Sequence, residues 1–143
     1  MNYTFYNPNT GEIIGIISTS DVDIAEQNLQ DKTWIEGYYD PGQYYISNGQ
    51  AIEKSIQPKD GHVYQYNISN NTWTINVEQE NIMIRKLRDT QLSQIDRVNP
   101  VWYAALTTEQ QQELQVYRQA LLDVPQQSGF PTDTVWPSKP TWL

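Results

Sequence analysis

The chain has 143 residues, of which 38% are hydrophobic and 18% are charged, and it contains no cysteine. This length fits one compact domain or two small lobes, and the lack of cysteine excludes a disulfide framework, a thiol nucleophile and a cysteine zinc site. A formal net charge of −8 argues against binding to nucleic acid, because phosphate backbones repel an acidic protein.

The start of the chain has neither a basic segment nor a long apolar run, since Gly15 interrupts the longest one. It therefore predicts neither a signal peptide nor a membrane span. Small secreted domains usually carry disulfides. We therefore expect an intracellular protein that does not insert into membranes.

Charge is distributed unevenly along the chain. Residues 1–78 contain ten acidic and three basic side chains, whereas residues 79–143 contain seven and six. This change in composition predicts a boundary near residues 77–80, with one lobe on each side of it.

Residues 1–78 have the pattern of short strands connected by turns. Residues 3–6 and 12–17 flank a loop of Asn, Pro, Thr and Gly, which predicts a first hairpin. Ser20 is the expected N-cap of a short helix that ends near Leu29.

Two more hairpins are expected in this lobe. Residues 43–47 return through Asn48-Gly49 to residues 50–52, and Asn-Gly between apolar runs is a strong hairpin signal. Residues 63–66 return through Ser69-Asn70-Asn71 to residues 72–75. The first lobe is therefore predicted to be mostly antiparallel sheet with one helix.

The second lobe changes to helical periodicity. Apolar residues share one face of a helix expected over about residues 79–96, namely Ile84, Leu87, Leu92 and Ile95. Arg88 and Gln91 lie within the same arc. They either reach solvent at its edge or form hydrogen bonds across a partly polar interface.

A second helix is expected after Asn99-Pro100, which ends the first one. It runs from about residue 108 to residue 124, and a capping box is available either from Thr107 with Gln110 or from Thr108 with Gln111. Its apolar side carries Leu106, Leu114, Tyr117, Leu121 and Val124. The short link between the two helices predicts an antiparallel hairpin.

The last segment, residues 125–143, contains four prolines and is predicted to be extended. Its apolar side chains either dock against the hairpin or form an exposed hook for a partner: Phe130, Val135, Trp136 and Trp142. The whole chain is thus predicted to have an α+β fold. A small antiparallel β-rich N-terminal lobe with one short helix precedes a C-terminal α-helical hairpin with an extended Pro-rich tail.

Signals for catalysis are weak. The single histidine, His62, has no nucleophile or carboxylate at a recognisable spacing. The chain contains neither G-x-x-x-x-G-K-S/T nor G-x-G-x-x-G, the two glycine-rich motifs that bind nucleotide phosphates. We expect no enzyme activity, no catalytic residue, no cofactor and no metal site, and any chaperone action would be independent of ATP.

The C-terminal motifs are more informative. Residues 85–89 read RKLRD, Ile95-Asp96 ends the first predicted helix, and residues 117–137 read YRQALLDVPQQSGFPTDTVWP. Together they resemble the phage tail assembly chaperone family, in which a helical hairpin carries an Arg-Asp pair and a Tyr-Arg-x-x-Leu motif before Pro, Phe-Pro and Trp-Pro. The resemblance covers about residues 79–140. Family members commonly have Trp directly after that Asp, whereas this chain has Arg97, with Trp102 as the nearest substitute.

The resemblance implies a protein that binds the phage tail fibre, a trimer, and assists its folding without ATP in the host cytoplasm. Tail fibres are long β-structured trimers that fold slowly and expose strand edges and apolar surface on the way. A stoichiometric partner that covers these surfaces suppresses misassembly. Such a protein either leaves the finished fibre or stays in the virion.

Amide and aromatic side chains are the candidate contact residues. Asn and Gln number 27, Tyr 10 and Trp 5, a composition that suits contacts with proteins or sugars. We expect partner contacts at Tyr38, Tyr39, Tyr44, Tyr45 and Trp73, and on the outward face of the second helix at Gln111, Gln115 and Gln119. In the competing hypothesis, a structural tail or adhesion module uses the same aromatic residues to contact a receptor or glycan.

Overall fold

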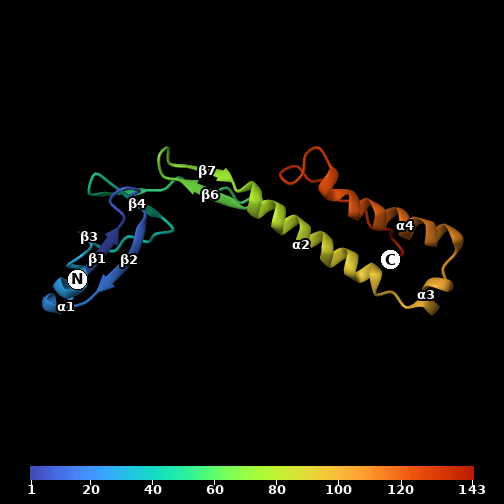
Figure 1. Ribbon diagram of the computed structural model, residues 1–143, viewed down its shortest axis with the longest axis horizontal. Coiled ribbons are helices and arrows are strands. Elements are labelled where there is room, and N and C mark those ends of the chain that lie inside the picture. Colours follow the sequence, from blue (N-terminus) through green and yellow to red (C-terminus); the bar gives the residue numbers. More distant parts are fainter. The chain divides into compact units, whose positions relative to one another are not determined.

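The computed structural model describes residues 1–143, which form two compact units. Unit 1 comprises residues 1–59 and 64–74, and unit 2 comprises residues 60–63 and 75–143. The predicted α+β fold is confirmed, because antiparallel strands and one short helix precede the C-terminal helices (Figure 1). None of the helices combines the length and the apolar character that crossing a bilayer requires.

A three-stranded antiparallel sheet and one helix make up the first part of unit 1. The strand order is β2-β1-β3, and the elements are β1 (Asn2–Tyr6), β2 (Ile13–Ser18), α1 (Val22–Leu29) and β3 (Thr33–Glu36). The first hairpin and the helix were predicted, but β3 was not. This strand has only four residues and pairs with the distant β1 instead of a neighbour in a hairpin, so no turn signal marks it.

The core of this part lies between α1 and one face of the sheet. Tyr3, Ala25 and Leu29 are buried there, with Phe5 and Ile17 packed against them. Gly15 lies directly opposite Phe5 in the register of β1 and β2. A Cβ atom at Gly15 would lie 2.5 Å from Cζ of Phe5, so glycine is required to make room for that ring.

The N-cap of α1 is Asp21, and the prediction of Ser20 was wrong by one position. The Asp21 carboxylate accepts hydrogen bonds from the backbone N–H groups of Asp23 (3.0 Å) and Ile24 (3.2 Å). Asp21 has an extended backbone, as an N-cap requires. Its carboxylate also lies at the positive end of the helix dipole.

The two further hairpins are confirmed with small shifts of their ends. They consist of β4 (Tyr44–Ser47) with β5 (Gln50–Glu53) and of β6 (Tyr64–Asn67) with β7 (Thr72–Ile75). The first loop of the chain is tied to β4, since the Ile46 N–H donates to the Gly11 carbonyl at 2.8 Å. Gly11 has a φ of 78°, and a Cβ there would lie 2.2 Å from the Ile46 oxygen, so only glycine fits.

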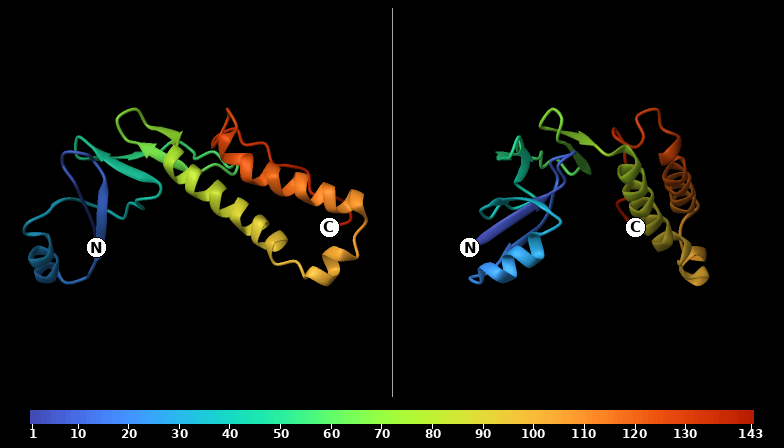
Figure 2. Two further views of the ribbon diagram at one scale, coloured as in Figure 1. Left: turned by 45° about the vertical axis from the view of Figure 1, so that its right-hand side comes forward. Right: turned by 60° about the vertical axis from the view of Figure 1, so that its left-hand side comes forward.

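Unit 2 is a helical hairpin with a docked tail (Figures 1 and 2). Its helices are α2 (Val77–Asp96), α3 (Pro100–Ala104), α4 (Thr108–Asp123) and the 3-10 helix η1 (Val124–Gln126). The buried core comprises Leu92, Ile95, Leu114, Tyr117 and Leu121. The partly buried side chains packed against it come from the inter-helix link, α4 and the tail: Tyr103, Leu106, Leu122, Trp136, Trp142 and Leu143.

Details of unit 2 differ from the prediction. Residues 100–104 form α3, because Pro100 ends one helix and also begins the next, with the Asn99 side chain accepting from the Val101 N–H at 2.8 Å. Leu87 is exposed instead of buried on the inner face of α2, and Val135 is 69% exposed instead of docked. The tail, expected to be extended throughout, begins with η1.

The two polar residues in the apolar arc of α2 behave differently. Arg88 forms an ion pair with the adjacent Asp89, at 2.6 Å between Nη2 and Oδ1. Gln91 lies at the helix interface, where its Oε1 accepts a hydrogen bond from the Tyr117 hydroxyl at 3.1 Å. The interface between α2 and α4 is therefore partly polar, and Gln91 satisfies the one polar atom that Tyr117 brings into the core.

The capping box of α4 is formed by Thr107 and Gln110, each bonding the backbone N–H of the other at 3.2 and 3.0 Å. We expect Thr107→Ala to lower the free energy of unfolding by about 1 kcal/mol, because one helix N–H loses its acceptor. Thr108→Ala is the matched control and should change it by less than about 0.5 kcal/mol, as is usual at exposed positions. Equal effects in urea denaturation would contradict the assignment.

Candidate partner-binding surfaces

Four of the five predicted aromatic contact residues take part in ring contacts within unit 1. Tyr39 packs edge-on against Tyr44, with ring centroids 5.6 Å apart. Tyr45 contacts Tyr66, and Tyr66 contacts Trp73, at 6.0 and 5.0 Å. The rings of Tyr45, Tyr66 and Trp73 therefore join the β4–β5 hairpin to the β6–β7 hairpin.

Polar contacts fix this aromatic cluster further. The Trp73 indole N–H donates to the Ser55 carbonyl at 2.7 Å. The Lys54 ammonium lies 4.7 Å from the Tyr66 ring centroid, and burial lowers the pKa of this lysine. These half-buried rings therefore contribute mainly to packing within unit 1.

Tyr38 differs from the other predicted tyrosines because its side chain is 62% exposed. The chain on both sides of it is anchored to the sheet. The buried Thr4 hydroxyl donates to the Gly37 carbonyl at 2.8 Å and accepts from the Tyr39 N–H at 3.2 Å. An anchored backbone presents the Tyr38 ring to solvent at low conformational cost, which suits a contact residue.

The predicted glutamines of α4 are not equivalent. Gln111 is half-buried, and its amide donates to the Tyr103 carbonyl at 3.0 Å and to the Leu106 carbonyl at 3.5 Å. Gln115 donates to the Tyr103 hydroxyl at 3.1 Å. Both therefore connect α4 to the inter-helix link. Gln119 is exposed and bonds Asp123 at 2.9 Å on the same helix.

A groove between α4 and the tail was missed by sequence reasoning. This α4–tail groove has a volume of about 720 Å³, and its walls are formed mainly by Val116, Tyr117, Ala120, Pro137 and Pro140. Val116 is 63% exposed. The carboxylate of Glu113 accepts the Trp142 indole N–H nearby. Val116 is an apolar residue outside the apolar arc of α4. This irregularity was the one feature of the sequence that could have indicated the groove.

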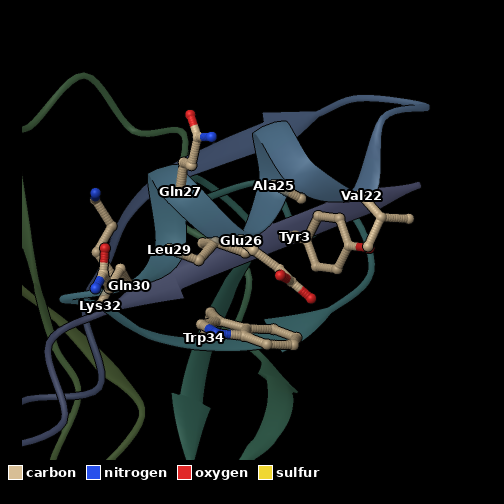
Figure 3. Close-up of a pocket in the computed structure, with 9 residues that line it drawn as sticks. All are labelled: Tyr3, Val22, Ala25, Glu26, Gln27, Leu29, Gln30, Lys32 and Trp34. Carbon is tan, nitrogen blue, oxygen red and sulfur yellow. The ribbon is translucent and has the colours of Figure 1, made fainter.

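A second groove lies between α1 and β3 in unit 1 (Figure 3). This α1–β3 groove has a volume of about 630 Å³ and is lined by Tyr3, Ala25, Glu26, Leu29, Lys32 and Trp34, among others. Trp34 is 44% exposed, and its ring meets that of Tyr3 edge-on at 5.3 Å. Because β3 was not predicted, nothing in the sequence placed Trp34 beside α1.

His62 and Glu80 form a pair within unit 2 that their spacing in the sequence had not indicated. The His62 Nδ1 lies 2.7 Å from Glu80 Oε1, and the Val63 N–H donates to Glu80 Oε2 at 2.7 Å. Glu80 is only 2% exposed. Its carboxylate therefore anchors residues 62–63 to the first turns of α2. No group of three or more His, Cys, Asp or Glu side chains forms a metal-binding cluster.

The pair predicts a pH dependence of stability. The hydrogen bond to Glu80 raises the pKa of His62 above its usual value of 6.5. The extra stability is therefore fully present below about pH 6.5 and is lost as the pH rises through the folded-state pKa. We expect the free energy of unfolding to fall as the pH rises from about 6.5 through the raised pKa of His62. A His62→Gln variant with the same slope over that range would contradict this origin.

An ion pair joins α2 to α4 on the outer side of the hairpin. The Arg118 Nε lies 2.8 Å from Asp96 Oδ1, and this hydrogen bond lowers the pKa of Asp96. The neighbouring Tyr117 reaches Gln91 on α2. Trp102, in α3, faces the tail's Trp142, with ring centroids 6.4 Å apart. The Tyr-Arg motif thus holds the two helices together, and Trp102 helps to hold the tail.

Comparison with known proteins agrees with these features of unit 2. Residues 81–141 match the family model described as phage tail assembly chaperone protein. No curated protein and no solved structure gives a significant match to the chain. The matched segment contains most of α2, all of α4 and the docked tail up to residue 141. It therefore contains the Asp96–Arg118 and Gln91–Tyr117 contacts. Residues 81–141 are thus similar to phage tail assembly chaperone proteins, which supports a role in phage tail assembly.

Proposed function

We propose that this protein binds the tail fibre of its phage and assists the folding and assembly of the fibre trimer in the host cytoplasm. The proposal rests mainly on the match of residues 81–141 to the chaperone family. The protein acts by stoichiometric binding and needs no ATP, because covering exposed surface lowers the free energy of an intermediate without any chemical step.

The exposed surfaces of the chain support this proposal. A slowly folding β-structured trimer exposes apolar side chains and strand edges. The α4–tail groove offers apolar walls of Val116, Ala120 and two prolines, rimmed by Glu109 and Glu113. A groove with apolar walls and a polar rim has the anatomy of a protein-binding site. A folding intermediate can therefore bury apolar surface there.

Adhesion is the second candidate function, and exposed Tyr38 is the observation that favours it. Aromatic rings with a polar tip suit contacts with receptors and glycans as well as with proteins. In that case the chain is a permanent structural part of the tail and does not change fibre folding.

Co-expression with the fibre protein of the same phage tests the proposal. We expect the chain to increase the yield of soluble fibre trimer and to co-purify with it. Val116→Glu, which places a charge in the α4–tail groove, should reduce that yield. Thr108→Glu, an equal change of charge at an exposed position of the same helix outside the groove, is the matched control and should leave the yield unchanged. Full trimer yield without the chain would contradict the proposal.

Mass spectrometry of purified virions separates the remaining alternatives. Rescue of the fibre together with presence in virions identifies a chaperone that is retained, and rescue without presence identifies one that leaves. Presence in virions without rescue supports the adhesion function. In that case Tyr38→Ala should reduce attachment to host cells while the amount of fibre trimer stays normal.

A further inference from the structure

The α1–β3 groove combines aromatic walls with a carboxylate that has no partner in the structure. From this combination we propose that the groove binds an arginine side chain of the tail protein, with the guanidinium group between Trp34 and Glu26. The inference rests on the proposed function only for the source of the arginine. The groove itself can be tested with a small cation.

The aromatic wall is partly open to a cationic ligand. The Tyr3 and Trp34 rings meet at 87° with centroids 5.3 Å apart, so they form a corner of the groove. Tyr3 is held in place because it is buried in the core and its hydroxyl donates to the Met1 sulfur at 3.0 Å. Trp34 is 44% exposed, so part of its ring is available to a ligand. Trp is the aromatic side chain that attracts cations most strongly.

The carboxylate of Glu26 supplies the charge. It comes from α1 and points toward the space bounded by the Tyr3 and Trp34 rings (Figure 3). The ion pairs of the structure are His62–Glu80, Arg88–Asp89 and Arg118–Asp96, so Glu26 takes part in none. A carboxylate beside an open aromatic face matches a cationic partner in both charge and shape.

The one cation of the chain that lines this groove is engaged elsewhere. The Lys32 ammonium donates to the Asn28 carbonyl and lies 5.4 Å from the Phe5 ring centroid. It therefore neither neutralises Glu26 nor covers the Trp34 ring. The groove thus keeps its negative charge for a ligand.

The surrounding charge also favours a cation. Unit 1 contains eight acidic and three basic side chains. Three of the acids lie in or directly before α1, at Asp21, Asp23 and Glu26. Such a field attracts a basic segment and raises its association rate.

Arginine fits this groove better than lysine. A planar guanidinium stacks on an aromatic ring and can donate two parallel hydrogen bonds to one carboxylate. It is also more weakly hydrated than an ammonium, so it loses less on entering a partly apolar groove. The apolar residues Val22, Ala25 and Leu29 line the rest of the groove and can contact the arginine's methylene groups.

The test uses the full chain and N-acetyl-arginine amide, followed through the Trp34 indole N–H signal in proton–nitrogen spectra. That signal is assigned with Trp34→Phe. We expect a saturable shift with a Kd on the order of 1–10 mM, which is typical of one side chain binding alone. N-acetyl-citrulline amide, which has the same shape without the charge, should bind at least about 5-fold more weakly.

Two variants make the test specific. Glu26→Gln should raise the Kd about 3–10-fold, since the guanidinium loses its charged acceptor. Glu53→Gln removes the same charge from an exposed position of β5 outside the groove, and should leave the Kd within about 2-fold. Equal binding of the citrulline probe, an unchanged Kd in Glu26→Gln, or no saturable shift would overturn the proposal.

The source of the arginine is tested separately by co-purification with the fibre protein. Glu26→Gln and Trp34→Leu should weaken capture of the fibre protein, whereas Glu53→Gln should not. If the Trp34 signal shifts with protein concentration alone, a second copy of this chain occupies the groove, and the proposed tail-protein arginine is wrong. If the chain rescues the fibre but the arginine probe does not bind, this inference fails while the proposed function stands.

Discussion

Replacing Tyr117 by alanine is expected to lower the free energy of unfolding of the helical hairpin by about 3–5 kcal/mol. Tyr117 is buried in the core of unit 2 together with Leu114 and Leu121. Its removal opens a cavity between α2 and α4 and leaves Gln91 without its hydrogen-bond donor. Urea denaturation followed by circular dichroism at 222 nm measures the effect, because α2 and α4 supply most of the helical signal.

Two controls divide this effect into its parts. Tyr117→Phe keeps the ring and removes the hydroxyl, so it should lower the free energy of unfolding by about 1 kcal/mol. Val116→Ala changes the neighbouring residue, which is 63% exposed, and should cost less than about 0.5 kcal/mol. If Tyr117→Ala were no worse than Val116→Ala, Tyr117 would not be part of the core.

Replacing Trp136 by alanine should lower the free energy of unfolding by about 2–3 kcal/mol, which is less than expected for a fully buried tryptophan. Trp136 belongs to the tail and is partly buried against the core of unit 2. Its loss should also loosen the tail, so that proteases cleave residues 125–143 faster. Limited proteolysis with mass detection measures this second effect.

The neighbouring Val135 provides the control for the tail. It is 69% exposed, so Val135→Ala should leave both the unfolding midpoint and the cleavage rate nearly unchanged. A Trp136→Ala protein with wild-type stability and wild-type cleavage would show that the tail is not held by this side chain.

Local signals were sufficient for most elements. Asn48-Gly49 marks its hairpin because both residues adopt positive φ, and Thr107 marks the start of α4 through its capping box. Strand β3 lacked such a signal because it pairs with β1 across the intervening β2 and α1. Helix α3 was missed because Pro100 ends one helix and begins another.

The candidate contact residues depend on tertiary structure, which a single sequence does not reveal. Composition selected tyrosines and glutamines, yet Tyr45 and Gln111 are occupied by internal contacts. Both grooves join segments that are distant in the chain, such as Tyr3 with Glu26 and Val116 with Pro140. The helical hairpin of unit 2 could be predicted because its buried apolar residues repeat with helical periodicity along α2 and α4.

Refolding of the purified fibre protein is the most direct test of the proposed function. Denatured fibre is diluted into buffer without nucleotide, with or without one equivalent of this chain, and the trimer is measured by size-exclusion chromatography. We expect the chain to raise the trimer yield in proportion to its amount, up to about one chain per fibre chain. The same trimer yield with and without the chain, at every ratio, would contradict a chaperone function.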